Sequence, residues 1–109
     1  MTEDNNTDLQ NWWHQVSMEE LDELLPKAKR YGALDLDAIG FVLCAMIGKH
    51  DATKAYRQEI ACHFYLLGKV GRMASAFQAG ELPSEDTLMD AAIYARMMMR
   101  IRQHGAWPA

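Results

Sequence analysis

The chain has 109 residues, half of them hydrophobic, and its 11 basic and 15 acidic residues give a net charge of −4. This length suits one domain that buries roughly two-thirds of the surface of the unfolded chain. Because the acidic balance offers no electrostatic footprint for nucleic acid or an anionic membrane, we expect no duplex DNA partner.

The N-terminal residues MTEDNNTD are acidic and polar, without the basic and apolar regions of a signal peptide. No apolar run is long enough to cross a membrane. Cys44 and Cys62 lie in apolar stretches without C-x-x-C spacing, which indicates buried reduced thiols and neither a disulfide framework nor a zinc site. We therefore expect a cytoplasmic protein with no membrane partner.

The N-terminal third is predicted to form one long helix. Residues 1–6 offer nothing to bury, so we expect them to be disordered and residues 7–109 to form a single helical domain. Thr7 and Gln10 match a capping box, and apolar residues then recur at helical spacing until Gly32 supplies a stop. A kink is expected at Pro26.

Two further helices are predicted in the middle of the chain. The first runs from a cap at Asp35 or Asp37 to about Ile47 and is apolar nearly all round, so we expect it to be the most enclosed. The second spans about residues 52–79 after a cap at Asp51. One sector of the second helix is expected to face inward; its apolar members are Tyr56, Ile60, Leu67, Val70 and Phe77.

A fourth helix is predicted from Glu85 to about His104, between Ser84 and Gly105. Since no alternating β-branched run appears, the expected fold class is an all-α, four-helix domain. The fourth helix is apolar over most of its circumference, which favours homo-oligomerisation as a homodimer or homotetramer. Its methionines, residues 97–99, either fill gaps in the core or form a subunit interface.

Several acids fall on apolar faces of the predicted helices. Buried carboxylates are costly unless they are neutralised by protons, basic partners or a cation. Oxygen-rich sites between helices suit Mg²⁺ or Mn²⁺, and such an ion can hold a polyphosphate and activate water. The pattern therefore predicts a hydrolytic metal site, with candidate ligands Glu20, Glu23, Glu59, Asp86 and Asp90.

Structural roles are open for each of these acids. Asp86 lies in a first helical turn, where an acid is favoured by the helix dipole. Asp90 could pair with Lys69 or Arg72. Those two cations either lie on a solvated face or bind phosphate oxygens.

The remaining acids also have ordinary explanations. Glu20 and Glu23 could be surface acids on a helix whose buried face is rotated from our projection. Glu59 and His63 are spaced i,i+4 and could interact with each other at a helix edge.

Short motifs resemble a known family. The element EELDE, residues 19–23, resembles the E-E-x-x-E element of MazG-like, all-α nucleoside triphosphate pyrophosphohydrolases. Residues 9–104 also resemble small bacteriophage proteins described as MazG-like, in which three elements follow in order. They are a Y-G segment at 31–32, a K-x-x-R helix at 69–72 and a D-x-x-x-D-x-x-x-Y helix at 86–94. This chain departs from the enzymes, whose second acidic element usually reads E-x-x-D.

The resemblance implies a nucleotide substrate and a Mg²⁺ or Mn²⁺ cofactor. Glu20 and Glu23 would be metal ligands, with Asp86 and Asp90 as the second acidic element. Tyr94 would either contact the nucleotide, by stacking on a base or hydrogen-bonding a phosphate, or be a packed aromatic residue. Water activated by Glu20 or Glu59 would attack a nucleoside triphosphate and release pyrophosphate, with Lys69 or Arg72 assisting.

A non-catalytic function is the alternative. A phage protein on this scaffold could bind a host protein through its methionine-rich surface, because methionine adapts to varied partners. The departure from the E-x-x-D element favours this alternative, whereas the inward acids favour the hydrolase.

Overall fold

The computed structural model describes residues 3–30 and 33–108, with side chains from residues 6 and 35 onward. The described chain is all-helical and contains no strand in these two ranges, which confirms the all-α part of the predicted fold class. It divides into two compact units, Met1–Arg30 and Tyr31–Ala109. The single domain expected over residues 7–109 stays a prediction.

The first unit is one helical segment with a change of pitch. Helix α1 spans Glu3–Glu19, the π-helix η1 spans Glu20–Leu24 and helix α2 spans Leu25–Arg30. The Leu25 N–H donates to the carbonyl of Glu20, five residues back. Pro26 lacks an N–H, and its ring crowds the preceding turn of the helix. The wider π-turn directly before Pro26 makes room for the ring, at the position where we predicted a kink.

The start of α1 differs from the sequence expectation. The helix begins at Glu3, so residues 3–6 are helical and not disordered, and Thr7 does not cap it. Asp and Asn side chains can support an early helical turn, and acids there favour the helix dipole. The expectations for residues 1–2, the stop at Gly32 and the Y-G segment at 31–32 lie outside the described residues.

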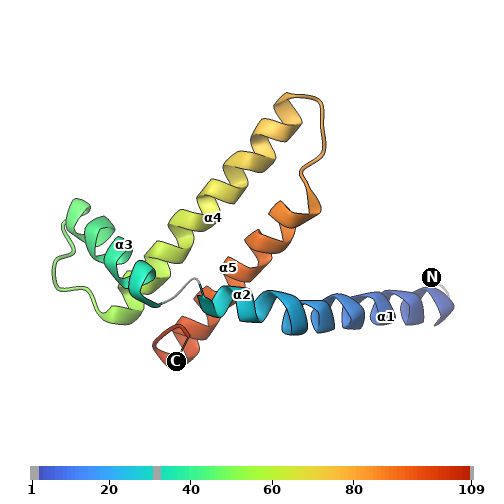
Figure 1. Cartoon of the computed structure of the whole chain (residues 1–109), viewed down its shortest axis with the longest axis horizontal. Coiled ribbons are helices and arrows are strands. Elements are labelled where there is room, and N and C mark those ends of the chain that lie inside the picture. The colour runs from blue at the N-terminus through green and yellow to red at the C-terminus, as the bar shows by residue number, and fades with distance from the viewer. Residues whose placement is uncertain (1–2, 31–32, 109) are drawn as a thin grey trace. The chain divides into compact units, whose positions relative to one another are not determined.

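The second unit consists of helix α4 and the two helices that pack against it, α3 and α5 (Figure 1). Helix α3 spans Ala33–Met46, α4 spans Lys54–Gln78 and α5 spans Glu85–His104. Helices α4 and α5 run antiparallel through the loop at residues 79–84, and α3 packs against the N-terminal part of α4. Helix α4 is therefore the shared wall of both helix pairs.

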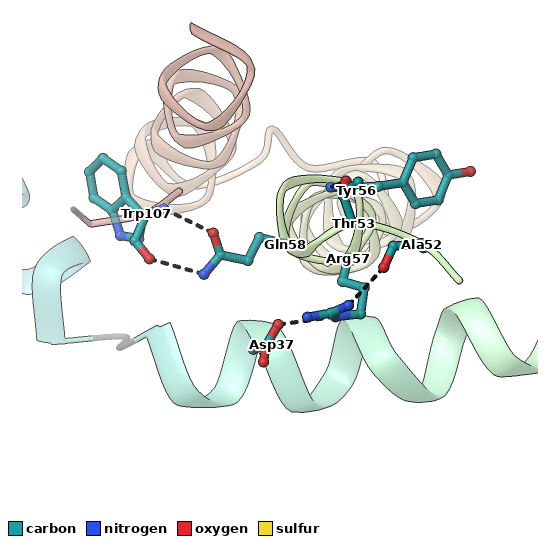
Figure 2. A network of polar contacts seen from close by, with 7 residues as sticks. All are labelled: Asp37, Ala52, Thr53, Tyr56, Arg57, Gln58 and Trp107. Atoms are coloured by element: carbon teal, nitrogen blue, oxygen red, sulfur yellow. Dashed lines mark hydrogen bonds and ion pairs between the residues drawn. The ribbon is translucent and has the colours of Figure 1, made fainter. Parts of the chain in front are cut away.

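Helices α3 and α4 approach most closely at Gly40. A Cβ atom added to Gly40 would lie 2.0 Å from the backbone oxygen of Arg57, so only glycine permits this crossing. The Arg57 side chain fastens the same contact: its Nε donates to Asp37 Oδ1 at 3.2 Å and its Nη1 to the carbonyl of Ala52 at 2.7 Å (Figure 2). Asp37 therefore joins two helices and does not cap α3, which begins earlier than expected.

Both ends of α4 are closed by local hydrogen bonds. Thr53, and not Asp51, is the N-cap: its hydroxyl oxygen accepts from the Tyr56 N–H at 3.2 Å. At the other end Gly80 has a φ of +77°. The Glu81 N–H then donates to the carbonyl of Ala76 at 2.9 Å, which is the pattern of a Schellman motif.

Helix α5 has the bounds that were predicted. Ser84 is its N-cap, with its hydroxyl oxygen accepting from the Thr87 N–H at 3.2 Å, and Gly105 is its C-cap. Its buried side chains follow a spacing of three and four residues and contribute to the core; they are Tyr94, Met97 and Ile101.

A C-terminal segment completes the core of the second unit. Gln58 of α4 is 0% exposed, and its side chain makes two hydrogen bonds to the backbone of Trp107. The amide Nε2 donates to the Trp107 carbonyl at 3.1 Å, and Oε1 accepts from the Trp107 N–H at 2.9 Å (Figure 2). A buried amide is tolerated here because both its polar atoms are paired.

Helix α3 buries the edge formed by Leu36, Gly40 and Cys44, and the apolar residues next to this edge are half-buried. Among residues whose side chains are described, a smaller share of α3 than of α4 or α5 is exposed, in line with the expectation that α3 would be the most enclosed helix. One of its sides nevertheless has no packed neighbour in the second unit, and large apolar side chains are exposed there: Phe41, Val42 and Met46.

No helix within residues 3–30 and 33–108 is both long enough and apolar enough to cross a membrane.

Candidate functional site

Helix α4 has a packed side and, opposite to it, an exposed apolar face. Gln58, Ala61 and Cys62 are buried on the side that packs against the other helices. Figure 2, which looks nearly along α4, shows Gln58 pointing toward Trp107 and Tyr56 pointing away from it. The second face therefore lies opposite the core.

This second face is a continuous row of side chains that we call the α4 stripe: Tyr56, Ile60, His63, Leu67, Val70, Ala74 and Phe77. Its largest members are well exposed, with Tyr56 at 42%, Leu67 at 53%, Val70 at 48% and Phe77 at 60%. We expected this sector to face inward, and that expectation is wrong. The core uses the opposite side of α4, where specific hydrogen bonds and an ion pair compensate its polar members.

The α4 stripe borders a shallow groove. The groove has a volume of about 190 Å³ and lies between α4 and α5; its lining residues are Tyr56, Glu59, Ile60, His63 and Met98. Three of these belong to the stripe, so the groove hollows the N-terminal half of the exposed apolar face. Such a hollow can accept an apolar side chain from a binding partner.

One predicted site acid pairs with one predicted phosphate-binding cation. Lys69 Nζ of α4 lies 3.2 Å from Asp90 Oδ2 of α5, and both side chains are mostly buried. The pairing that we had considered for Asp90 is therefore present, between facing helices. Lys69 does not lie on a solvated face, whereas Arg72 is exposed.

Glu59 is also engaged by a base. Its Oε1 accepts from Arg102 Nη2 of α5, so a second ion pair joins the two helices next to the groove. Cys62 lies one turn further on, and burial, together with the negative charge of Glu59, raises the pKa of its thiol from 9.0 to about 12. Cys62 and Cys44 are both buried free thiols, as the sequence predicted.

The predicted nucleotide-contacting residue is part of an aromatic pair. Tyr94 is buried, and its ring stacks on that of Tyr65 with centroids 5.5 Å apart and planes 11° apart. Burial raises the pKa of Tyr65, with smaller contributions from Asp35 and Cys62. The stack joins α4 to α5, and a contact between Tyr94 and a nucleotide stays a prediction.

The five predicted metal ligands fall in different parts of the chain. Glu20 and Glu23 lie in η1 of the first unit, and the other three lie in the second unit. Asp86 is exposed in the first turn of α5. Over the described ranges, no group of three His, Cys, Asp or Glu residues could hold a metal ion. Convergence of the five acids stays a prediction.

Sequence reasoning missed three residues that organise this region. They are Gln58, Arg102 and Gly40, to which the sequence pattern assigned no role. A buried glutamine gives no periodic signal, since its burial depends on a backbone partner 49 residues away. The regular spacing of the α4 stripe was visible in the sequence, but not the side on which it lies.

Comparison of this chain with family models, with curated proteins and with solved structures gives no match.

Proposed function

We propose that this chain is a non-catalytic helical interaction protein, which binds an amphipathic helix of a protein partner on the α4 stripe. The observation that carries the proposal is the position of the stripe, which lies opposite the packed side of α4 and exposes Leu67, Val70 and Phe77 by about half or more. Single exposed apolar residues are ordinary, whereas a contiguous apolar patch marks a site of association.

The spacing of the α4 stripe supports a helix as the bound element. Its seven positions follow one another at intervals of four and three residues from Tyr56 to Phe77. This average of 3.5 residues is the repeat that keeps a seam facing a partner helix along its whole length. An extended peptide or a small ligand would not need such a long regular row.

The methionines of α5 contribute less than the sequence suggested. Met97 is buried in the core and Met98 is half-buried at the groove, so only Met99 is well exposed. Of the two explanations for these methionines, core filling applies to Met97. The binding surface in this proposal is therefore the α4 stripe, with Met98 at its edge.

Binding of a labelled amphipathic peptide tests the proposal. Fluorescence anisotropy would follow a fluorescein-labelled helical peptide with leucine at heptad positions, at a concentration where the peptide is monomeric. We expect saturable binding to the wild-type chain and at least 10-fold weaker binding to Leu67→Glu, because the substitution puts a charge in the middle of the seam.

Leu82→Glu is the matched control, since Leu82 is 83% exposed in the loop between α4 and α5 and lies outside the stripe. It should bind like the wild type. Equal binding by the wild type, Leu67→Glu and Leu82→Glu, or no binding to any of them, would overturn the proposal.

The mostly buried pair Lys69–Asp90 supports a second proposal, hydrolysis of a nucleoside triphosphate by a MazG-like phage protein. A base and an acid held between facing helices suit a polyphosphate with its Mg²⁺ or Mn²⁺ ion, which would supply charge neutralisation when bound. Lys69 would then pass from Asp90 to a phosphate oxygen. Within the second unit, the acids assigned to the ion in this proposal are Glu59, Asp86 and Asp90.

Metal titration followed by a nucleotide assay tests this second proposal. It requires that Mg²⁺ or Mn²⁺ raises the melting temperature and that nucleoside triphosphates release pyrophosphate. Asp90→Asn should abolish both effects, whereas Asp8→Asn, an exposed acid of α1, should keep them. A melting temperature indifferent to either ion, together with no pyrophosphate release, would refute it.

A further inference from the structure

We propose that the partner of the α4 stripe is the α4 stripe of a second copy of this chain, paired antiparallel in a homodimer. This inference rests on the proposed function, since it names the helix that the stripe binds. It is carried by three independent features of α4: the absence of charge along the seam, the sizes of the facing side chains, and the position of the groove.

The α4 stripe, which would form the seam between the two copies, has no charged group that would repel a second copy. Its seven members are apolar apart from Tyr56 and His63. The flanking positions from residue 64 onward are also uncharged; they are Phe64, Leu66, Gly71, Met73 and Gln78. Flanking charges are what select a different partner in paired helices, so an uncharged seam of this kind suits self-association.

The charged residues of α4 near the stripe are already engaged within the second unit. Arg57 pairs with Asp37 of α3, Lys69 with Asp90 of α5, and Glu59 with Arg102 of α5. The remaining cations of α4, Lys54 and Arg72, fall outside the seam and its flanking positions. Two copies can therefore approach along the stripe without bringing unpaired like charges together.

The sizes of the side chains favour an antiparallel over a parallel pair of α4 helices. In an antiparallel pair with its two-fold axis at the level of Gly68, each layer of the seam contains either a large and a smaller side chain or two side chains of middle size. His63 of one protomer faces the partner's Ala74, Leu67 faces the partner's Val70, and Ile60 faces the partner's Phe77. A parallel pair would instead stack His63 on His63 and Phe77 on Phe77, and would leave a void at Ala74.

Gly71 and the groove fit the same register. A Cβ added to Gly71, a flanking position of the stripe, meets nothing within 4 Å, so there is room beside Val70 for the close approach of a second helix. At each end of the pair, the partner's Phe77 comes against Ile60, which lines the groove of about 190 Å³. An aromatic side chain seated in such a hollow is typical of the residues that dominate binding energy.

Sedimentation equilibrium of the full chain from about 10 to 500 µM tests the dimer. We expect the wild type to fit a monomer–dimer equilibrium, and Leu67→Glu to weaken association at least 10-fold while keeping the wild-type circular dichroism spectrum. Leu82→Glu, outside the stripe, should associate like the wild type. A wild type that is monomeric at every concentration, or a Leu67→Glu chain that still dimerises equally, would overturn the inference.

Disulfide trapping tests the orientation. Ile60→Cys and Phe77→Cys chains, mixed in a glutathione buffer, should form the mixed disulfide between positions 60 and 77. Each variant alone should cross-link poorly, because like positions lie far apart in the antiparallel pair. Cys44 and Cys62 are buried and serve as an internal background in the wild type. Efficient cross-linking of Ile60→Cys to itself would show a parallel pair and overturn the antiparallel inference.

The peptide-binding assay separates this inference from the proposed function. A monomeric chain that still binds an amphipathic helical peptide through Leu67 refutes the homodimer and leaves the interaction protein standing. A chain that neither dimerises nor binds the peptide refutes both. A chain that dimerises through the stripe supports both, and the peptide should then compete with dimerisation.

Discussion

At the scale of single residues, Gly40 is a glycine of the second unit at which an added side chain has no room. We expect Gly40→Ala to lower the free energy of unfolding by about 3 kcal/mol or more, because the new methyl group would overlap the Arg57 backbone at 2.0 Å and separate α3 from α4. This corresponds to a fall in melting temperature of about 10 °C or more, measurable by thermal denaturation.

Gly68→Ala is the matched control for this substitution. Gly68 lies within α4 and an added Cβ meets nothing within 4 Å, so the better helix propensity of alanine should raise stability by up to about 1 kcal/mol. Equal effects of the two substitutions would contradict the close crossing at Gly40.

Ionisation of the Cys62 thiol should lower the free energy of unfolding at alkaline pH. Its pKa is about 12 in the folded chain and near 9.0 when unfolded. The unfolded chain therefore releases the proton first as pH rises, so the stabilising contribution is complete below pH 9 and is lost between pH 9 and 12. Between pH 9 and 10.5, urea unfolding should show a loss of about 1.5 kcal/mol in the free energy of unfolding that is absent from Cys62→Ala. Identical pH slopes for both chains would contradict it.

At the scale of elements, the C-terminal segment depends on one side chain of α4. Gln58→Leu keeps the volume but leaves the N–H and carbonyl of Trp107 without their hydrogen bonds, at a cost of about 3 kcal/mol. In a chain carrying Trp12→Phe and Trp13→Phe, the emission of Trp107 should shift to longer wavelength as the segment detaches.

Gln78→Leu tests whether this effect is specific. Gln78 is exposed at the C-terminal end of α4, away from Trp107, so its substitution should change neither the emission nor the stability by more than about 0.5 kcal/mol. A blue-shifted, stable Trp107 in Gln58→Leu would show that packing alone holds the segment.

The elements also show what the sequence could predict. The bounds of α5 follow from Ser84 and Gly105, since both caps act on neighbouring backbone groups. The buried side of α4 depends on distant partners, because Gln58 pairs with the C-terminal backbone and Lys69 with Asp90 of the next helix. The hydrophobic pattern predicts that the uniformly apolar α4 stripe is buried, because the side of α4 that is packed contains polar as well as apolar residues. The pattern therefore selects the wrong face of the helix.

The candidate site was predicted only in part for the same reason. The acids Glu59 and Asp90 were expected to face inward, and both are held between α4 and α5, where each pairs with a base. The pairing of Asp90 with Lys69 could be considered from the sequence. The pairing of Glu59 with Arg102, 43 residues away, depends on how the two antiparallel helices pack against each other. Local periodicity carries no information about that register.

At the scale of the whole molecule, the division into two units predicts that the second one folds without the first. Helix α4 packs against both α3 and α5, and the Gln58–Trp107 hydrogen bonds close the unit at its C-terminus. A fragment that begins at residue 31 therefore retains the Gly40 crossing, both α4–α5 ion pairs and the buried core of α5. We expect this fragment to unfold cooperatively in urea, as a small single domain does.

The same fragment links this division to function, because the α4 stripe lies entirely within it. We expect it to keep the monomer–dimer equilibrium of the full chain in sedimentation experiments, and Leu67→Glu in the fragment to abolish it. A non-cooperative unfolding transition in urea would contradict the independent folding of the second unit. A cooperative fragment that no longer associates would instead place part of the binding surface in residues 1–30, which carry the exposed side chains of Leu9, Trp12 and Trp13.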